Sequence, residues 1–451
     1  MAVGSVRRGL RVLRHPAQYV VAGFATASLV GAGLLMLPVA ATSGRSTGFV
    51  DAWFTATSAV CVTGLAVVDT GTHWSGVGEA VILALVQIGG LGVMTLSALI
   101  VVGLARRLGL RQRLIAAAST GTPQLGEVRS ILRGVALVTL LVESTVAVAL
   151  ALRFATAYDL GLGRALWEGL FHAVSAFNNA GFGLRSDNLV PFQDDPVILL
   201  LVAAAIVVGG LGFPVWVQIA RQPRHPRRWN LHAKLTIAAT LGLLLAGWFA
   251  IGALEWTNPA TLGAMDAPGS LLNSFFASVT PRTAGFNALD YGAMREEGRL
   301  VTEVLMFVGG GSGSTAGGIK VTTFAVLAFV IWSEVRADPD VTIFHRRIPP
   351  QAQRQALTVA LLAVAILVSA LLALLRLTDL SLDALLFEAV SALGTVGLSV
   401  GITPGLPDPA KVLLVGLMLL GRVGPPTLFA ALVSRERERL YRHPEERPIV
   451  G

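Results

Sequence analysis

An apolar run from Val301 to Trp332 is interrupted by the segment Val308-Gly309-Gly310-Gly311-Ser312-Gly313-Ser314-Thr315-Ala316-Gly317-Gly318-Ile319-Lys320. The interior of a bilayer offers no water to backbone N–H and C=O groups, so irregular chain is tolerated there only where it lines a wet cavity or is enclosed by protein. The alternative is a connection between two short helices outside the membrane. The segment lacks the adjacent Gly-Lys-Ser/Thr of a phosphate-binding loop. We predict that residues 309–318, called the glycine loop below, cross a translocation path and form its gate.

The composition indicates a membrane protein with many spans, placed in the cell membrane. The chain has 451 residues, of which 54% are hydrophobic and 14% charged, and its mean hydropathy is +0.69. The net charge of +8 comes from arginine clusters between apolar stretches, which are typical of cytoplasmic flanks of spans and do not indicate nucleic-acid binding. The single cysteine, Cys61, excludes an intrachain disulfide and a multi-cysteine metal site. The run from Tyr19 to Ala41 is too long for a cleavable signal peptide, so we expect it to be the first span.

Eight apolar stretches approach or exceed the roughly 20 residues needed to cross a bilayer. They lie at 18–41, 80–104, 131–152, 195–220, 234–254, 301–332, 356–377 and 410–433. Arginines cluster at both ends of the chain and in every second connection, which predicts that both termini and these connections are cytoplasmic. The opposite connections carry aspartates, which we expect to face outside and to attract cations.

Each predicted outside connection contains a short amphipathic segment that ends in a turn of small residues. The four segments are Thr57–Leu65, Val174–Phe182, Ser278–Phe286 and Val390–Leu398. Their glycines, at 64, 181, 285 and 397, lie 117, 104 and 112 residues apart (181−64, 285−181, 397−285). This repeat predicts an all-α fold of four units, each a helix, a re-entrant pore loop and a helix, around a pseudo-four-fold pore. The units would span 1–110, 111–228, 229–350 with the glycine loop, and 351–451.

The second helix of each predicted unit has glycines at a corresponding place. The first two units carry Gly89-Gly90-Leu91-Gly92 and Gly209-Gly210-Leu211-Gly212, and the fourth carries Gly421-Arg422-Val423-Gly424. In the first two units these glycines are expected to permit close helix packing. In the alignment Arg422 corresponds to Gly90 and Gly210.

A ring of backbone carbonyls can replace the hydration shell of an ion without adding a fixed charge that would trap it. Glycine permits such a ring because it tolerates positive φ, and the partly negative C-terminal ends of the preceding half-helices favour a cation. We therefore predict that the four turns form an ion filter with potassium bound only at their carbonyls. The predicted filter residues are Val62, Thr63, Gly64, Asn179, Ala180, Gly181, Thr283, Ala284, Gly285, Thr395, Val396 and Gly397.

These glycine turns, the interrupted sixth span and the motif Gly421-Arg422-Val423-Gly424-Pro425 resemble the Trk/Ktr/HKT superfamily of potassium transporters, and most of all its KtrB-type membrane subunits. The resemblance covers about residues 18–433. It implies potassium uptake stimulated by sodium, a homodimer in the lipid membrane, and gating by a cytoplasmic KtrA-like nucleotide-binding ring. Gly64 favours potassium, because plant members that transport sodium have serine there. The unequal turns leave a sodium-conducting or sodium-coupled member as the alternative.

Six further residues carry expectations. Arg422 lies within the last span, where a charge is costly; we expect it to face the path below the filter as part of the gate, or else to pair with Glu303 or Glu388. Lys320 is expected to extend to the cytoplasmic surface. The side chains of Asn178 and Asn179 are expected to stabilise the second turn, with direct binding of the ion as the alternative. Glu143 and Arg153 are expected to be structural or interfacial.

Two other function classes are less well supported by the sequence. A membrane enzyme would bring a cluster of acid, base or metal-binding residues, and none is evident, so we expect no enzyme and no tightly bound cofactor. An alternating-access transporter would favour a two-fold internal repeat over four similar units. Whether ions pass as through a channel or by coupled transport stays open.

Overall fold

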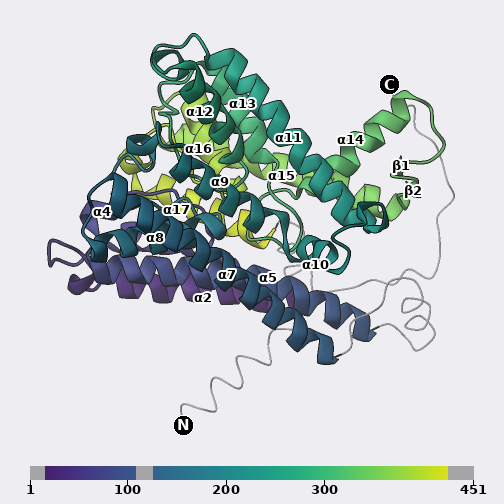
Figure 1. Ribbon diagram of the computed structural model, residues 1–451, viewed down its shortest axis with the longest axis horizontal. Coiled ribbons are helices and arrows are strands. Elements are labelled where there is room, and N and C mark those ends of the chain that lie inside the picture. Colours follow the sequence, from purple (N-terminus) through teal and green to yellow (C-terminus); the bar gives the residue numbers. More distant parts are fainter. Residues whose placement is uncertain (1–15, 108–124, 425–451) are drawn as a thin grey trace.

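The computed structural model describes residues 16–107 and 125–424, and these residues are mainly helical (Figure 1). The first elements are α2 (Pro16–Leu35), η1 (Pro38–Ala40), α3 (Phe49–Val60), α4 (Thr70–His73) and α5 (Gly76–Arg107). They are followed by α7 (Leu125–Ala157), α8 (Leu162–Phe177), η2 (Val190–Phe192), α9 (Pro196–Leu211), α10 (Phe213–Arg221) and η3 (Pro226–Arg228).

The second half of the chain repeats the sequence of a long helix, a short helix and a further helix. Its first elements are α11 (Leu231–Glu255), η4 (Leu262–Ala264), α12 (Ala267–Val279), α13 (Glu296–Phe307) and α14 (Val321–Val335). The antiparallel strands β1 (Thr342–Ile343) and β2 (Arg346–Arg347) pair Thr342 with Arg347. The last elements are α15 (Pro350–Leu377), α16 (Leu382–Gly394), η5 (Thr403–Gly405) and α17 (Asp408–Val423).

Several helices begin where a polar side chain accepts from the free N–H groups of the first turn. Asn230 accepts from Ala233 N at the start of α11, and Asp266 accepts from Gly269 N at the start of α12. These bonds satisfy donors that have no partner within the helix. Local sequence therefore fixes where these helices start.

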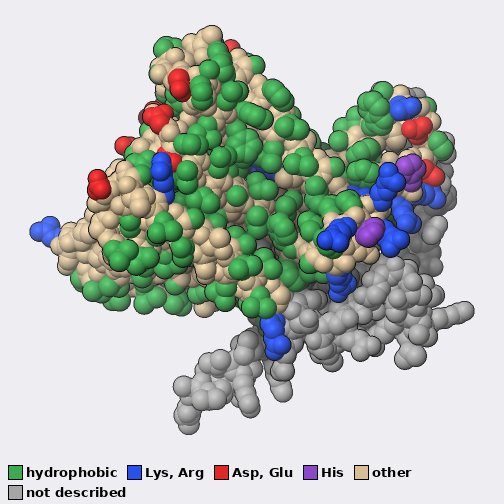
Figure 2. Space-filling model, viewed as in Figure 1, with side chains coloured by type: hydrophobic (Ala, Val, Ile, Leu, Met, Phe, Trp, Pro, Cys, Tyr) green, Lys and Arg blue, Asp and Glu red, His purple; other side chains and the backbone are tan. Residues whose placement is uncertain are grey.

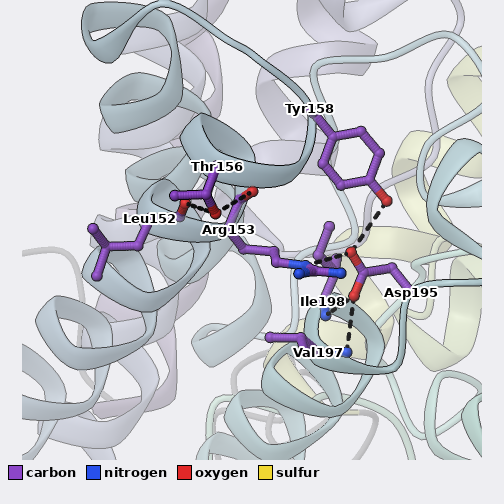
Figure 3. A network of polar contacts seen from close by, with 7 residues as sticks. All are labelled: Leu152, Arg153, Thr156, Tyr158, Asp195, Val197 and Ile198. Carbon is purple, nitrogen blue, oxygen red and sulfur yellow. Dashed lines mark hydrogen bonds and ion pairs between the residues drawn. The ribbon is translucent and has the colours of Figure 1, made fainter.

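Asp195 caps α9 and also joins two helices (Figure 3). It accepts from Val197 N at 3.0 Å, from Arg153 Nε at 2.8 Å and from the Tyr158 hydroxyl at 3.1 Å. Arg153 and Tyr158 come from the end of α7 and the residue after it. Arg153 thus has the structural role expected from its position.

The first and last helices of the described chain meet. Helix α17 packs against α2 and α3, and Lys411 Nζ on α17 lies 2.8 Å from Asp51 Oδ1 on α3. The chain therefore closes on itself.

Within the described residues, four helices are long and apolar enough to cross a membrane, and a bent pair would make five. The four are α2, α7, α11 and α15, and they expose leucines and aromatic residues such as Leu141, Phe249 and Leu372, as a lipid-facing surface requires. The eight spans expected from the sequence stay a prediction. Three of the four second helices end at glycines: α9 ends at Leu211 before Gly212, α13 at Phe307 before the glycine loop, and α17 at Val423 before Gly424. The second helix of the first unit, α5, continues through its glycines to Arg107.

Two of the expected spans need correction. The span expected at 18–41 ends as a helix at Leu35, and a 3₁₀ turn that begins at Pro38 follows. The span expected at 195–220 is two helices, α9 and α10, that meet at an angle of 92°. Gly212 makes the bend with φ of +90°, a conformation that glycine adopts without steric cost.

Basic side chains are concentrated at one end of the molecule (Figure 2). Exposed basic residues gather near α10, η3 and the β1–β2 hairpin: Arg221, Arg224, Arg227, Arg228, Arg346 and Arg347. Acidic side chains lie both beside this basic group and on the opposite side in this view. The arginines near the two ends of the chain, which predicted cytoplasmic termini, lie outside the described residues. The side of the membrane on which the termini lie therefore stays a prediction.

We expect the Asp195→Ala protein to unfold at a lower temperature than wild type. The change removes the α9 cap, which is worth about 1 kcal/mol, and leaves Arg153 without its carboxylate. Thermal unfolding of the detergent-solubilised protein measures the effect, with Tyr158→Phe as a control that removes only one hydrogen bond. An Asp195→Ala midpoint no lower than that of Tyr158→Phe would contradict this role.

Candidate functional site

Each of the four predicted filter turns contains a left-handed residue two positions before its glycine. The residues and their φ angles are Val62 (56°), Asn179 (59°), Thr283 (69°) and Thr395 (49°). Left-handed residues commonly end helices, but this position usually takes glycine, and a residue with a Cβ pays about 1 kcal/mol to adopt it. The surrounding structure therefore holds four strained positions in equivalent places.

The four glycines that follow lie against one another in a closed ring. A Cβ built on any of them would approach the carbonyl oxygen that precedes the next glycine along the ring, at distances no real side chain tolerates. These distances are 2.4 Å from Gly64 to Ala180 O, 2.8 Å from Gly181 to Ala284 O, 2.2 Å from Gly285 to Val396 O, and 2.0 Å from Gly397 to Thr63 O. The structure thus brings the predicted filter residues together, each turn next to the following one and the fourth next to the first.

Local hydrogen bonds hold the N–H groups of these turns. Thr63 N, Ala180 N and Val396 N donate to the backbone carbonyls of Ser58, Ser175 and Ser391 at 2.7, 2.7 and 2.8 Å. Gly64 N and Gly397 N each donate to a serine Oγ six residues earlier, both at 3.0 Å. Because the donors are satisfied within their own turns, the carbonyl oxygens are the groups that remain to meet a cation.

The third turn is supported differently, by a residue that the sequence analysis did not single out. Arg282 is 6% exposed, and its guanidinium donates to Thr240 O at 3.1 Å and to Thr240 Oγ1 at 3.3 Å. Its position, three before the ring glycine, holds Cys61, Asn178 and Gly394 in the other turns. In the sequence, Arg282 could have been noticed because it is the only charged residue at this position of the four aligned turns.

A cavity of about 500 Å³ opens on one face of the ring and is lined by its four glycines and by Asp69, Asp187 and Asp290. Partial burial raises the pKa of Asp69, but hydrogen bonds from Ser186, Thr72 and Gly71 outweigh it and hold that pKa below its ordinary value. The Asp69 carboxylate therefore stays charged at the cavity mouth. Among the described residues, no group of three or more His, Cys, Asp and Glu side chains is placed to hold a metal ion.

The glycine loop lies on the other face of the ring, against the ends of the short helices. Thr315 Oγ1 donates to Phe177 O at 3.1 Å, and a Cβ on Gly317 would lie 1.9 Å from Thr395 Oγ1. The loop also follows the end of α9, where Gly311 N donates to Gly210 O at 2.8 Å. Residues 314–317 are buried, so the loop is enclosed by protein as its composition predicted.

Arg422 joins the glycine loop to the first unit. Its guanidinium donates to Thr315 O and, at 2.9 Å, to Gly89 O on α5, and the residue is 6% exposed. The structure thus places Arg422 beside the loop, and no ion pair between the described residues joins it to Glu303 or Glu388. Glu388 instead accepts from the Ser399 and Thr403 hydroxyls.

The expectation for Lys320 was wrong. Its ammonium group does not extend to the surface but turns back and donates to Ala316 O at 2.6 Å. The irregular loop leaves carbonyls without helical partners, and the nearest cationic side chain satisfies one of them.

The asparagines of the second turn face protein groups. Asn178 Nδ2 donates to Gln87 Oε1 at 2.8 Å and to Glu143 Oε1 at 3.0 Å. The Asn179 amide lies 3.2 Å from Thr315 Oγ1. These contacts with protein groups are compatible with the predicted role of stabilising the turn, which stays a prediction.

Comparison with known proteins yields a family and a fold. A family model described as a cation transport protein, TrkH, matches residues 10–440. The chain is 39% identical over 436 residues to the Ktr system potassium uptake protein B of Bacillus subtilis, with 97% of each chain covered. It is 36% identical over 453 residues to the potassium/sodium uptake protein NtpJ of Enterococcus hirae, with 99% of each covered.

A solved structure has the same fold. The chain matches the potassium transporter TrkH from Vibrio parahaemolyticus with a TM-score of 0.74 at 19% identity, covering 94% of this chain and 86% of that one. At this identity the likeness concerns the fold alone.

We expect Gly397→Ala to abolish ion uptake, because its Cβ would lie 2.0 Å from Thr63 O and force the ring apart. Gly44→Ala is the matched control: Gly44 also has a positive φ, of +65°, but nothing lies within 4 Å of its Cβ position. Both variants place a Cβ on a residue of positive φ, but only that of Gly397→Ala meets a neighbouring backbone atom, so uptake into cells at equal membrane expression tests the ring contact. Equal uptake by the two variants would rule out a narrow ring.

Proposed function

The chain belongs to the TrkH family of cation transport proteins, and on that premise we propose that it takes up potassium across the cell membrane through the ring of glycine turns. Because this is a family of transporters, the expectation that the chain is not an enzyme is confirmed, and so is the resemblance found in its motifs. The proposal relies most on one observation, the closed contact of Gly64, Gly181, Gly285 and Gly397 with their neighbours' carbonyls.

In the proposed path an ion enters the aspartate-lined cavity, loses water and meets the ring. Carbonyl oxygens of residues 62–64, 179–181, 283–285 and 395–397 replace its hydration shell. The short helices α3, α8, α12 and α16 end at these turns, and their partly negative C-terminal ends favour a cation over an anion.

The proposed architecture has four units, 1–110, 111–228, 229–350 and 351–451, with eight passages through the membrane and both termini cytoplasmic. The order of long, short and further helices supports it. The basic end formed by α10, η3 and the hairpin would face the cytoplasm.

The proposed gate is the glycine loop with Arg422. The loop lies across the face of the ring where the short helices end, so it must move for an ion to leave. The Arg422 guanidinium binds the loop at Thr315 and α5 at Gly89. At an effective dielectric of about 20, its charge would repel a cation roughly 6 Å away by about 3 kcal/mol, which slows passage without preventing it.

Regulation and assembly form the finer part of the proposal. The names of the relatives that are Ktr system proteins support a separate partner component. We further propose, from the resemblance alone, that this partner is a cytoplasmic KtrA-like nucleotide-binding ring and that the chain forms a homodimer in the membrane. The name of the Enterococcus hirae relative includes sodium, which supports sodium as an activator and keeps a sodium-conducting protein as the second candidate. Potassium is the substrate, and no bound cofactor is proposed.

We expect Arg422→Gln to raise cation uptake about threefold to tenfold, since Gln can keep only one of the two hydrogen bonds that join the loop to α5, and one such bond is worth about 1 kcal/mol. Arg422→Lys keeps the charge but cannot hold two separated carbonyls. Uptake and the yield of folded protein are measured for both variants. If the charge is the barrier, Lys resembles wild type; if the tether is the barrier, Lys resembles Gln. A loss of folded protein without a gain in uptake rules out both.

Expression should restore growth of a potassium-uptake-deficient bacterium at low external potassium, and added sodium should improve it. The Gly397→Ala variant is the negative control. Sodium accumulation without potassium rescue would favour the second candidate. Rescue by the variant would show that the ring is not the path.

A further inference from the structure

A buried carboxylate lies behind the second filter turn, and neither the filter nor the gate accounts for it. Glu143 on α7 is 6% exposed, and none of the ion pairs between described residues includes it. Burial of a carboxylate without a cationic partner is costly unless hydrogen bonds compensate for it. The position of such a group therefore indicates a role other than packing.

Two amide side chains compensate the charge, and they come from different helices. Gln87 Nε2 on α5 donates to Glu143 Oε2 at 3.2 Å, and Asn178 Nδ2 donates to Glu143 Oε1 at 3.0 Å. Asn178 Nδ2 also reaches Gln87 Oε1 at 2.8 Å. The three side chains thus form a closed triangle between α5, α7 and the end of α8.

Asn178 transmits this triangle to the filter, because it directly precedes the left-handed Asn179, with Ala180 and the ring glycine Gly181 next. The amide oxygen of Asn178 lies close to α5: a Cβ built on Gly90 would be 1.8 Å from Asn178 Oδ1. The glycine on α5 and the carboxylate on α7 therefore fix Asn178 from two sides.

We propose that Glu143 is a positioning residue for the second filter turn, acting through Asn178 and linking that turn to the first unit through Gln87. The inference rests on the proposed function of the ring as an ion filter. A carboxylate suits the role because each of its two oxygens accepts one of the two donors. An amide of the same shape has one oxygen, so either Gln87 or Asn178 would face an N–H₂ group and shift.

The test is the ratio of rubidium uptake, as a potassium tracer, to sodium uptake by purified protein in liposomes. Glu143→Gln should lower this ratio about threefold to tenfold, the effect of losing one ordinary hydrogen bond. Glu143→Asp retains both acceptors and should recover part of the ratio. A wild-type ratio in folded Glu143→Gln would overturn the proposal.

Glu255→Gln is the matched control. Glu255 is fully buried and accepts from Asn258 Nδ2 and the Thr261 hydroxyl, both at 2.7 Å, but it contacts none of the filter turns through these bonds. The same chemical change there should leave the ratio at its wild-type value. If it lowers the ratio equally, the effect is general destabilisation and the positioning role is rejected.

Two further variants keep the outcomes distinct. Gly64→Ser alters the ring itself: if it changes the ratio while Glu143→Gln does not, only the positioning role fails, and if neither does, the filter assignment fails. If Glu143→Gln gives no folded protein, Gln87→Met decides. It removes the two sides of the triangle that involve Gln87 without altering charge, so a lowered ratio supports the proposal and a wild-type ratio overturns it.

Discussion

The structure depends on how closely each ring glycine approaches the carbonyl oxygen of the next turn. Even the smallest side chain would place a carbon 2.0 to 2.8 Å from that oxygen, so the spacing of the ring in this chain requires glycine at all four places. Helices α3, α8, α12 and α16 must then deliver their turns to the same point. The contact between Lys411 on α17 and Asp51 on α3 joins the last unit to the first, which is where a ring built from one chain must be closed.

On the face of the ring toward the helix ends, glycines of the second helices lie in close contact with the ends of the short helices. Gly89, Gly209 and Gly421 each present a backbone surface to a carbonyl at the end of a short helix, 1.9 to 2.0 Å from where a Cβ would stand. In the third unit the chain leaves this pattern and forms the glycine loop, which binds the end of α9 and accepts from Arg422. The third predicted unit thus supplies a segment that contacts the second and fourth.

The sequence predicted the features that backbone chemistry dictates. Glycines in aligned turns indicated the ring, and an irregular polar segment within an apolar run indicated an enclosed loop. It did not predict the 92° bend at Gly212, because a glycine in an apolar helix is compatible with a straight span. Nor did it place Lys320 or Arg282, since their partners are backbone carbonyls and a threonine that no pattern marks. The roles of Glu143 and Gly90 depend on a contact between helices more than 50 residues apart.

The residue three before each ring glycine is Cys61, Asn178, Arg282 or Gly394, a different chemistry at every quarter of the ring. In a pore assembled from four identical subunits, one substitution would alter all four quarters at once. Any loss of stability would then occur four times. Here the quarters are covalently joined and genetically independent. Each can therefore drift, specialise or be tuned alone, so that selectivity and regulation can evolve by single steps around an axis that is symmetric only in its backbone.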